Sequence, residues 1–137
     1  MPDFRAVTDA FAVSPQIFPS DVDAAAARGF TLIINNRPDG ESPGQPSGAQ
    51  IQAAARAAGL AYAYIPVSGR PTPEQVEQVR AATAGPGKAL AFCRSGTRSI
   101  VTWALGQAAA GAMSREHLVS LGAAAGYDLA GLPPARR

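Results

Sequence analysis

The chain has 137 residues, a formal net charge of +2 at pH 7 and one cysteine, with 47% hydrophobic and 16% charged residues. This length suits one ordinary domain, and the composition excludes a disordered chain. The 12 basic residues are scattered, which argues against a nucleic-acid-binding protein. No apolar run approaches the roughly 20 residues of a membrane span, no signal-peptide pattern opens the chain, and one cysteine with one histidine gives no metal-ligand spacing. We expect a soluble, cytoplasmic domain without membrane partner, metal or cofactor.

Segments typical of strands and of helices alternate along the chain. Short apolar runs predict strands, and apolar residues recurring every three or four positions after a capping residue predict helices. In chain order the predicted elements are strands over 4–7 and 11–13, a helix over 21–28, a strand over 30–35, a helix over 48–58, a strand over 60–65, a helix over 73–83, a strand over 88–92 and helices over 98–110 and 114–125. The alternation predicts an α/β fold, in which a central, mostly parallel sheet is flanked by helices. We expect a single domain over 1–137, with its core at 4–126 and a tail at 127–137.

Capping residues indicate where several helices begin. Ser20 and Ser47 are expected N-caps, and Thr72 with Gln75 forms the pattern of a capping box. Residues 36–48 hold three prolines and three glycines, which predicts a long loop.

The cysteine, Cys93, stands where an apolar strand passes into a helix through a small, polar turn that ends at Arg98. The positive end of a helix, a neighbouring guanidinium and inward-pointing amides all stabilise a thiolate over a thiol. Backbone N–H groups that curl around one point also bind an anion. The sequence therefore predicts a nucleophilic Cys93 beside an anion site, with Arg98 as its catalytic partner.

The rest of this turn is expected to bind the anion, and it consists of Arg94, Ser95, Gly96, Thr97 and Ser99. The hydroxyls would donate hydrogen bonds to the thiolate, and the glycine would let the backbone approach a ligand. The alternative is that a free cysteine merely packs in the core, as such residues often do. A packing cysteine needs none of the surrounding arginines, hydroxyls and glycine, so we favour the catalytic interpretation.

Three residues outside the turn are auxiliary candidates. Arg37 and Arg70 would attract an anionic substrate. Asp39, or Glu41 in the same loop, could supply a general acid, although Pro-Asp-Gly is also ordinary turn chemistry. His117 lies within a predicted helix, where we expect a surface histidine.

Three motifs together resemble the β-lactamase-hydrolase-like protein family: Asn35–Glu41, Tyr64–Val67 and Phe92–Ser99. The match spans about residues 4–125. The resemblance implies a fold like that of tyrosine and dual-specificity phosphatases, and an activity described as phosphatase-like or as sulfur transfer. The family's fused arrangements further imply a metallo-hydrolase partner that handles persulfides.

The length of the cysteine turn separates the two activities. Tyrosine-phosphatase-like enzymes place five residues between cysteine and arginine, whereas four lie between Cys93 and Arg98. Cys-Arg-Ser-Gly-x-Arg-Ser is instead similar to the active loop of single-domain rhodaneses. Phosphate esters also need a general acid for their leaving group, and Val67–Thr72, where such phosphatases usually keep one, has no carboxylate. Persulfide formation needs no such acid.

We therefore expect a sulfurtransferase that carries a persulfide on Cys93. The alternative is a phosphatase that forms a phosphocysteine, and a third hypothesis is a non-catalytic module that binds an anion or senses oxidation at the cysteine. The expected partner is a small anionic substrate, either a sulfane-sulfur donor or a phosphate ester. The sequence does not fix the oligomeric state.

Overall fold

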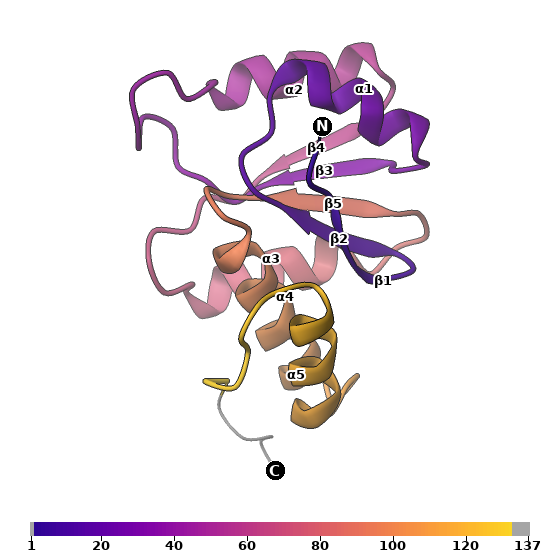
Figure 1. Ribbon diagram of the computed structural model, residues 1–137, viewed down its shortest axis with the longest axis vertical. Helices are drawn as coiled ribbons and strands as arrows, with labels where there is room; N and C mark the ends of the chain where they lie inside the picture. The colour runs from indigo at the N-terminus through magenta and orange to yellow at the C-terminus, as the bar shows by residue number, and fades with distance from the viewer. Residues whose placement is uncertain (1, 133–137) are drawn as a thin grey trace.

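The computed structural model describes residues 2–132 and shows one sheet between two layers of helices (Figure 1). The strands are β1 (Arg5–Thr8), β2 (Phe11–Ser14), β3 (Leu32–Asn35), β4 (Ala61–Tyr64) and β5 (Ala89–Phe92). The helices are α1 (Pro19–Ala27), α2 (Gly48–Ala57), α3 (Pro73–Ala82), α4 (Thr97–Ala109) and α5 (Arg115–Ala124). Helices α1 and α2 cover one face of the sheet, and α3, α4 and α5 cover the other. The predicted α/β fold class is confirmed.

The sheet has five strands in the order β1-β2-β5-β3-β4. β1 pairs antiparallel with β2, and the other pairings are parallel. In the register of the sheet, Phe92 at the end of β5 lies opposite Ser14 on one side and Asn35 on the other. The chain segments that leave β2, β5 and β3 therefore start side by side at one edge of the sheet.

The order of the connections places β5, the strand that precedes Cys93, in the centre of the sheet. From β2 to β3 and from β3 to β4 the chain moves outward in one direction, with α1 and α2 on the same face. From β4 it returns through α3 to β5, between β2 and β3. Because parallel crossovers are right-handed, the reversed direction puts α3 on the opposite face. Ligands of open α/β sheets bind at such a reversal, outside the carboxyl ends of the strands.

The helix caps agree with the sequence in two cases and differ in one. The hydroxyl of Ser47 accepts from the N–H of Gln50 at 3.2 Å, and that of Thr72 accepts from Gln75 at 3.1 Å. The prediction of Ser20 as the first N-cap was wrong, because α1 already begins at Pro19, a residue suited to a first helical position. The Asp21 carboxylate accepts from the N–H of Phe18 instead, at 2.8 Å.

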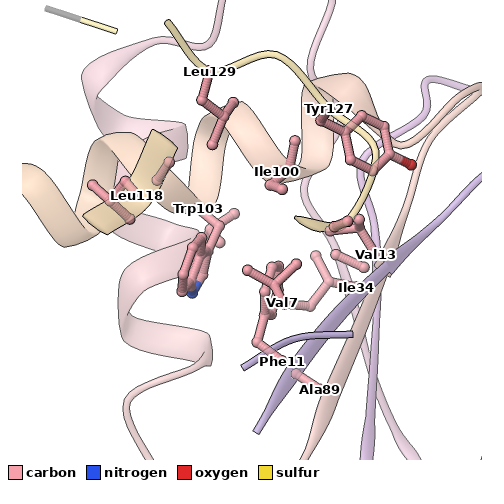
Figure 2. Close-up of a cluster of buried hydrophobic side chains, with 14 of the residues drawn as sticks. Val7, Phe11, Val13, Ile34, Ala89, Ile100, Trp103, Leu118, Tyr127 and Leu129 are labelled. Carbon is pink, nitrogen blue, oxygen red and sulfur yellow. The ribbon is translucent and has the colours of Figure 1, made fainter. Parts of the chain in front are cut away.

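The core extends beyond the predicted boundary at residue 126. Tyr127, Leu129 and Leu132 are buried against Trp103 and the rest of the cluster between the sheet and α4 (Figure 2). Aromatic and leucine side chains gain free energy from leaving water, which explains why this segment packs rather than frays. The remaining part of the predicted tail, 133–137, lies outside the described residues.

Over residues 2–132, none of the helices combines the length and the apolar character needed to cross a membrane.

Candidate functional site

Cys93 is the first residue after β5, and its side chain is fully buried. Its Sγ accepts a hydrogen bond from the backbone N–H of Gly96 at 3.1 Å. Gly96 adopts a left-handed conformation, with φ of 96°, directly before α4, and this conformation favours glycine. Burial alone would suit a packing cysteine, but the inward-pointing amide is the feature expected of a thiolate site.

The predicted ring of amides is formed only in part around the sulfur. The N–H of Thr97 donates to the hydroxyl of Ser95, at 3.4 Å, rather than toward Cys93. Within the described part of the chain, the N–H groups of Arg94, Ser95, Arg98 and Ser99 have no acceptor. Such unpaired donors at the start of a helix are suited to an anion.

Arg98 is fixed by two neighbouring segments. Its Nη1 donates to the carbonyl of Val67 and to Oε2 of Glu41, each at 2.7 Å, and its Nη2 donates to Oε1 of Glu41 at 2.8 Å. The hydrogen bond to Glu41 raises the pKa of the guanidinium, partial burial opposes this, and the negative charge of an ionised Cys93 raises the pKa further. In the described part of the chain, no oxygen accepts from the Nε–H or from the second Nη2–H. The guanidinium also interacts with the side chain of Cys93, so these donors are suited to an oxyanion bound beside the sulfur.

Glu41 is held from the other side by Arg37. The Nε of Arg37 donates to Oε1 of Glu41 at 2.9 Å, and its other nitrogens donate to Gln16 and Ser42. Hydrogen bonds from Arg98 first, and from Arg37 next, lower the pKa of Glu41 to about 2. Glu41 is therefore a carboxylate at neutral pH and has no proton to give to a leaving group. Arg37, a predicted auxiliary residue, is buried and anchors the loop.

Asp39 is engaged elsewhere. Its carboxylate accepts from the N–H of Gly48 at 2.7 Å, at the start of α2, and its own N–H donates to the hydroxyl of Tyr64. A carboxylate at the N-terminus of a helix is stabilised by the helix dipole. The structure thus favours the turn and capping role over a general acid for Asp39.

The remaining candidates lie at the surface or below the turn. Arg70 is exposed and lines a pocket that Arg98 also lines. Arg94 is exposed, and its carbonyl accepts from the N–H of Gln16. The hydroxyl of Ser99 is buried and has no partner in the described structure. His117 is exposed on α5, as expected of a surface histidine.

Tyr127 supports the cysteine turn, a role that no local sequence pattern predicts. Its hydroxyl donates to the carbonyl of Ser95 at 2.8 Å, and a side chain on Gly96 would collide with the same hydroxyl. Figure 2 shows its ring against Ile100 and Val13 with the oxygen pointing away from the cluster. The spacing of Tyr127, Leu129 and Leu132 was an available signal of burial in a segment assigned to the tail.

Residues 2–132 contain no cluster of three or more His, Cys, Asp or Glu side chains that could hold a metal ion.

Comparison with protein families gives one match over most of the chain. Residues 3–110 match the model of the family described as "Beta-lactamase hydrolase-like protein, phosphatase-like domain". The beta-lactamase hydrolase-like protein of Xylella fastidiosa is 42% identical over 125 residues, and that of Agrobacterium fabrum is 38% identical over 127 residues. Each alignment covers 90% of this chain but only 29% of the relative. The chain thus spans less than a third of the length of these curated relatives.

Solved structures share the fold. A "putative phosphatase" from Neisseria meningitidis has a TM-score of 0.83 at 31% identity, over 95% of this chain and 93% of that one. Tk-PTP in its active form has a TM-score of 0.70 at 20% identity, over 93% and 87% of the two chains. PTPMT1 in complex with PI(5)P has a TM-score of 0.70 at 11% identity, over 86% and 80%. These likenesses confirm the predicted resemblance to tyrosine and dual-specificity phosphatases at the level of the fold.

Proposed function

The chain belongs to the family of phosphatase-like domains of beta-lactamase hydrolase-like proteins, and on that premise we propose that it hydrolyses phosphate monoesters with Cys93 as the nucleophile. The family and the shared fold favour this alternative over the sulfur transfer that the sequence analysis expected first. The observation that carries the proposal is the joint placement of the thiol, an amide directed at its sulfur and a fixed arginine with one free edge.

Substrate binding follows from the donors that the turn leaves unpaired. A phosphate dianion would accept hydrogen bonds from the free amides between Arg94 and Ser99 and from the open Nε–Nη2 edge of Arg98. A planar guanidinium binds two phosphate oxygens at once, with more directional strength than an ammonium group. Because Cys93 is fully buried, the turn must open far enough for the phosphorus to reach its sulfur.

The chemistry has two displacement steps. The thiolate of Cys93 attacks phosphorus, and as the S–P bond forms the ester P–O bond breaks. The leaving oxygen takes its proton from water, since Glu41 is ionised and Asp39 is bound to α2. A second water then attacks the phosphocysteine and gives its proton to the hydroxide left by the first water. The P–S bond breaks, and hydrogen phosphate and the thiolate are released. Arg98 stabilises the charge on the transferred group in both steps.

Sulfur transfer remains a second candidate because one observation favours it. Only four residues separate Cys93 from Arg98, and a short turn suits the single terminal sulfur of a persulfide better than a tetrahedral phosphate. In that case the thiolate attacks a sulfane sulfur, a sulfur–sulfur bond forms, and the donor leaves as a stable anion without needing an acid.

Parallel assays on one preparation separate the two candidates. We expect the wild-type protein to release phosphate from p-nitrophenyl phosphate, and Cys93→Ser to release none. Thiosulfate followed by intact-mass measurement tests for a one-sulfur adduct on Cys93. Stable sulfur loading together with no phosphate release would replace the proposed function by the second candidate.

A matched pair of arginine variants tests the role of the guanidinium fork. Arg98→Lys keeps the positive charge but removes the fork, and we expect kcat/KM for p-nitrophenyl phosphate to fall about 100-fold. Arg94→Lys changes an exposed arginine of the same turn, and its effect should stay within about threefold, in line with a surface substitution. Equal losses in both variants would contradict the special role given to Arg98.

A further inference from the structure

A pocket of about 530 Å³ lies beside the cysteine turn, on the side of α4. Three segments line it: the loop 69–71, the first three turns of α4 and the segment 128–132. Its volume lies within the 300–1,000 Å³ typical of small-molecule sites. The mechanism described above does not use this space.

The walls of the pocket are mostly aliphatic. Val101 and Leu105 of α4 face Leu129 and Leu132 across it, and no aromatic side chain lines it. The charged groups in its lining are Arg70, Asp128 and Arg98. Arg70 and Asp128 carry opposite charges, so apart from Arg98 the pocket presents no net charge to a ligand. Such a lining suits a neutral, flexible, apolar group.

The pocket borders the proposed phosphate site at two residues. Thr97 and Arg98 belong to both the cysteine turn and the lining of the pocket. A phosphate held by the guanidinium of Arg98 would therefore have its ester group directed either to solvent or into this space. An apolar ester group gains free energy only in the second position.

We infer that this pocket is the subsite for an alkyl group of the substrate, and that the substrate class is small, single-chain alkyl phosphate monoesters dissolved in water. The inference rests on the proposed function and names its substrate class. The size of the pocket suits one small molecule, and its aliphatic walls favour a methylene chain over an aromatic ring, which would gain from aromatic partners that are absent from the lining.

Binding of an alkyl phosphate series tests the subsite without requiring turnover. We would titrate methyl, propyl, butyl and hexyl phosphate into the Cys93→Ser variant by calorimetry, below the concentrations at which the longer esters aggregate. Each methylene that enters the pocket should tighten binding by about threefold, within the limit set by burying a methylene group. An affinity that does not change with chain length would overturn the inference.

Two matched leucines control for the location of the effect. Leu105 and Leu121 are both partly buried against the same core cluster, and only Leu105 lines the pocket. Leu105→Ser should flatten the chain-length dependence and leave methyl phosphate binding unchanged, whereas Leu121→Ser should keep the dependence. Val101→Thr, which conserves shape and adds a hydroxyl to the wall, serves if a serine variant fails to fold. If affinity depends on alkyl chain length as strongly in Leu105→Ser or Val101→Thr as in the wild type, the alkyl chain does not bind in this pocket.

The same series separates this inference from the proposed function. If affinity rises with chain length but the wild-type protein hydrolyses no ester, the phosphatase proposal fails and the subsite stands. If phosphate is released from every ester with the same kcat/KM, the function stands and the subsite fails. Faster hydrolysis of phosphatidic acid in vesicles than of dissolved hexyl phosphate would overturn the choice of a dissolved substrate.

Discussion

Glu41 determines which edge of Arg98 is available to a substrate. Its two carboxylate oxygens accept hydrogen bonds from Nη1 and Nη2 of the guanidinium, and the same carboxylate also accepts one from Nε of Arg37. Among residues 2–132, no oxygen accepts a hydrogen bond from the opposite edge of Arg98. We therefore interpret Glu41 as a positioning residue rather than as a proton donor.

Replacing Glu41 by glutamine tests this positioning role. Glu41→Gln keeps the shape but removes one charge-assisted pair, so Arg98 should hold phosphate less well and KM for p-nitrophenyl phosphate should rise about tenfold, with a smaller change in kcat. Glu77→Gln, which breaks an exposed pair with Arg80 on α3, is the control. A lower KM in Glu41→Gln would mean that the carboxylate competes with phosphate instead of positioning its ligand.

The same ion pair predicts an acid dependence of stability. The pKa of Glu41 is about 2 in the folded protein against an ordinary value of 4.5. Its contribution is therefore fully present above pH 4.5 and is lost as pH falls toward 2. Because Glu41 is exposed, solvent screening keeps the loss below the roughly 3 kcal/mol that an unscreened shift of this size would give. Urea unfolding at several pH values should show a smaller loss on acidification in Glu41→Gln. The prediction would be contradicted if the free energy of unfolding fell with pH by the same amount in Glu41→Gln and in the wild type.

At the scale of elements, the passage from β5 to α4 sets the geometry of the turn. Gly96 turns the chain with a positive φ, directs its N–H to Cys93 and lies directly under the hydroxyl of Tyr127. Gly96 therefore meets three requirements of the turn: it adopts the left-handed conformation, donates the hydrogen bond to the sulfur and leaves room for the Tyr127 hydroxyl.

Two glycine variants separate these requirements from the effect that any glycine-to-alanine substitution has on stability. Gly96→Ala would force a side chain into a left-handed conformation and into Tyr127, so we expect a loss of about 1–3 kcal/mol in stability from the backbone alone and a large loss of phosphate release. Gly85→Ala has open space around it and no positive φ and should be neutral or slightly stabilising. Circular-dichroism melting and the phosphatase assay measure both effects, and an active, stable Gly96→Ala protein would refute this account of the turn.

Local chemistry explains which elements could be predicted. The caps at Ser47 and Thr72 were predictable because they depend on residues three positions apart. The cysteine turn was predictable for the same reason. The contact between Glu41 and Arg98 joins residues 57 positions apart, so it depends on the order of strands in the sheet and not on any local pattern. Sequence reasoning therefore placed Cys93 and Arg98 in one turn, but it did not find Glu41, which binds the arginine.

At the scale of the whole molecule, the segment after α5 closes the core over α4. Tyr127, Leu129 and Leu132 are each less than 10% exposed and belong to the cluster shown in Figure 2. Leu129 and Leu132 also line the pocket that we propose as the alkyl subsite. We predicted a tail over residues 127–137, and the spacing of these three apolar residues was the signal against that prediction.

Truncation tests the contribution of this segment. A chain that ends at residue 126 loses three buried side chains, each contributing about 1.5–3 kcal/mol, and it should unfold at lower urea concentration or fail to fold. A chain that ends at residue 132 keeps every contact described here and is the control. Equal urea midpoints for the two chains would show that residues 127–132 are dispensable.

The most direct test of the central claim is rapid acid quenching of the wild-type protein during turnover of p-nitrophenyl phosphate, followed by intact-mass and peptide analysis. We predict a transient phosphoryl adduct located on Cys93 and its absence in Cys93→Ser. Release of phosphate without any adduct on Cys93, or an adduct on another residue, would contradict a mechanism in which this thiolate attacks phosphorus.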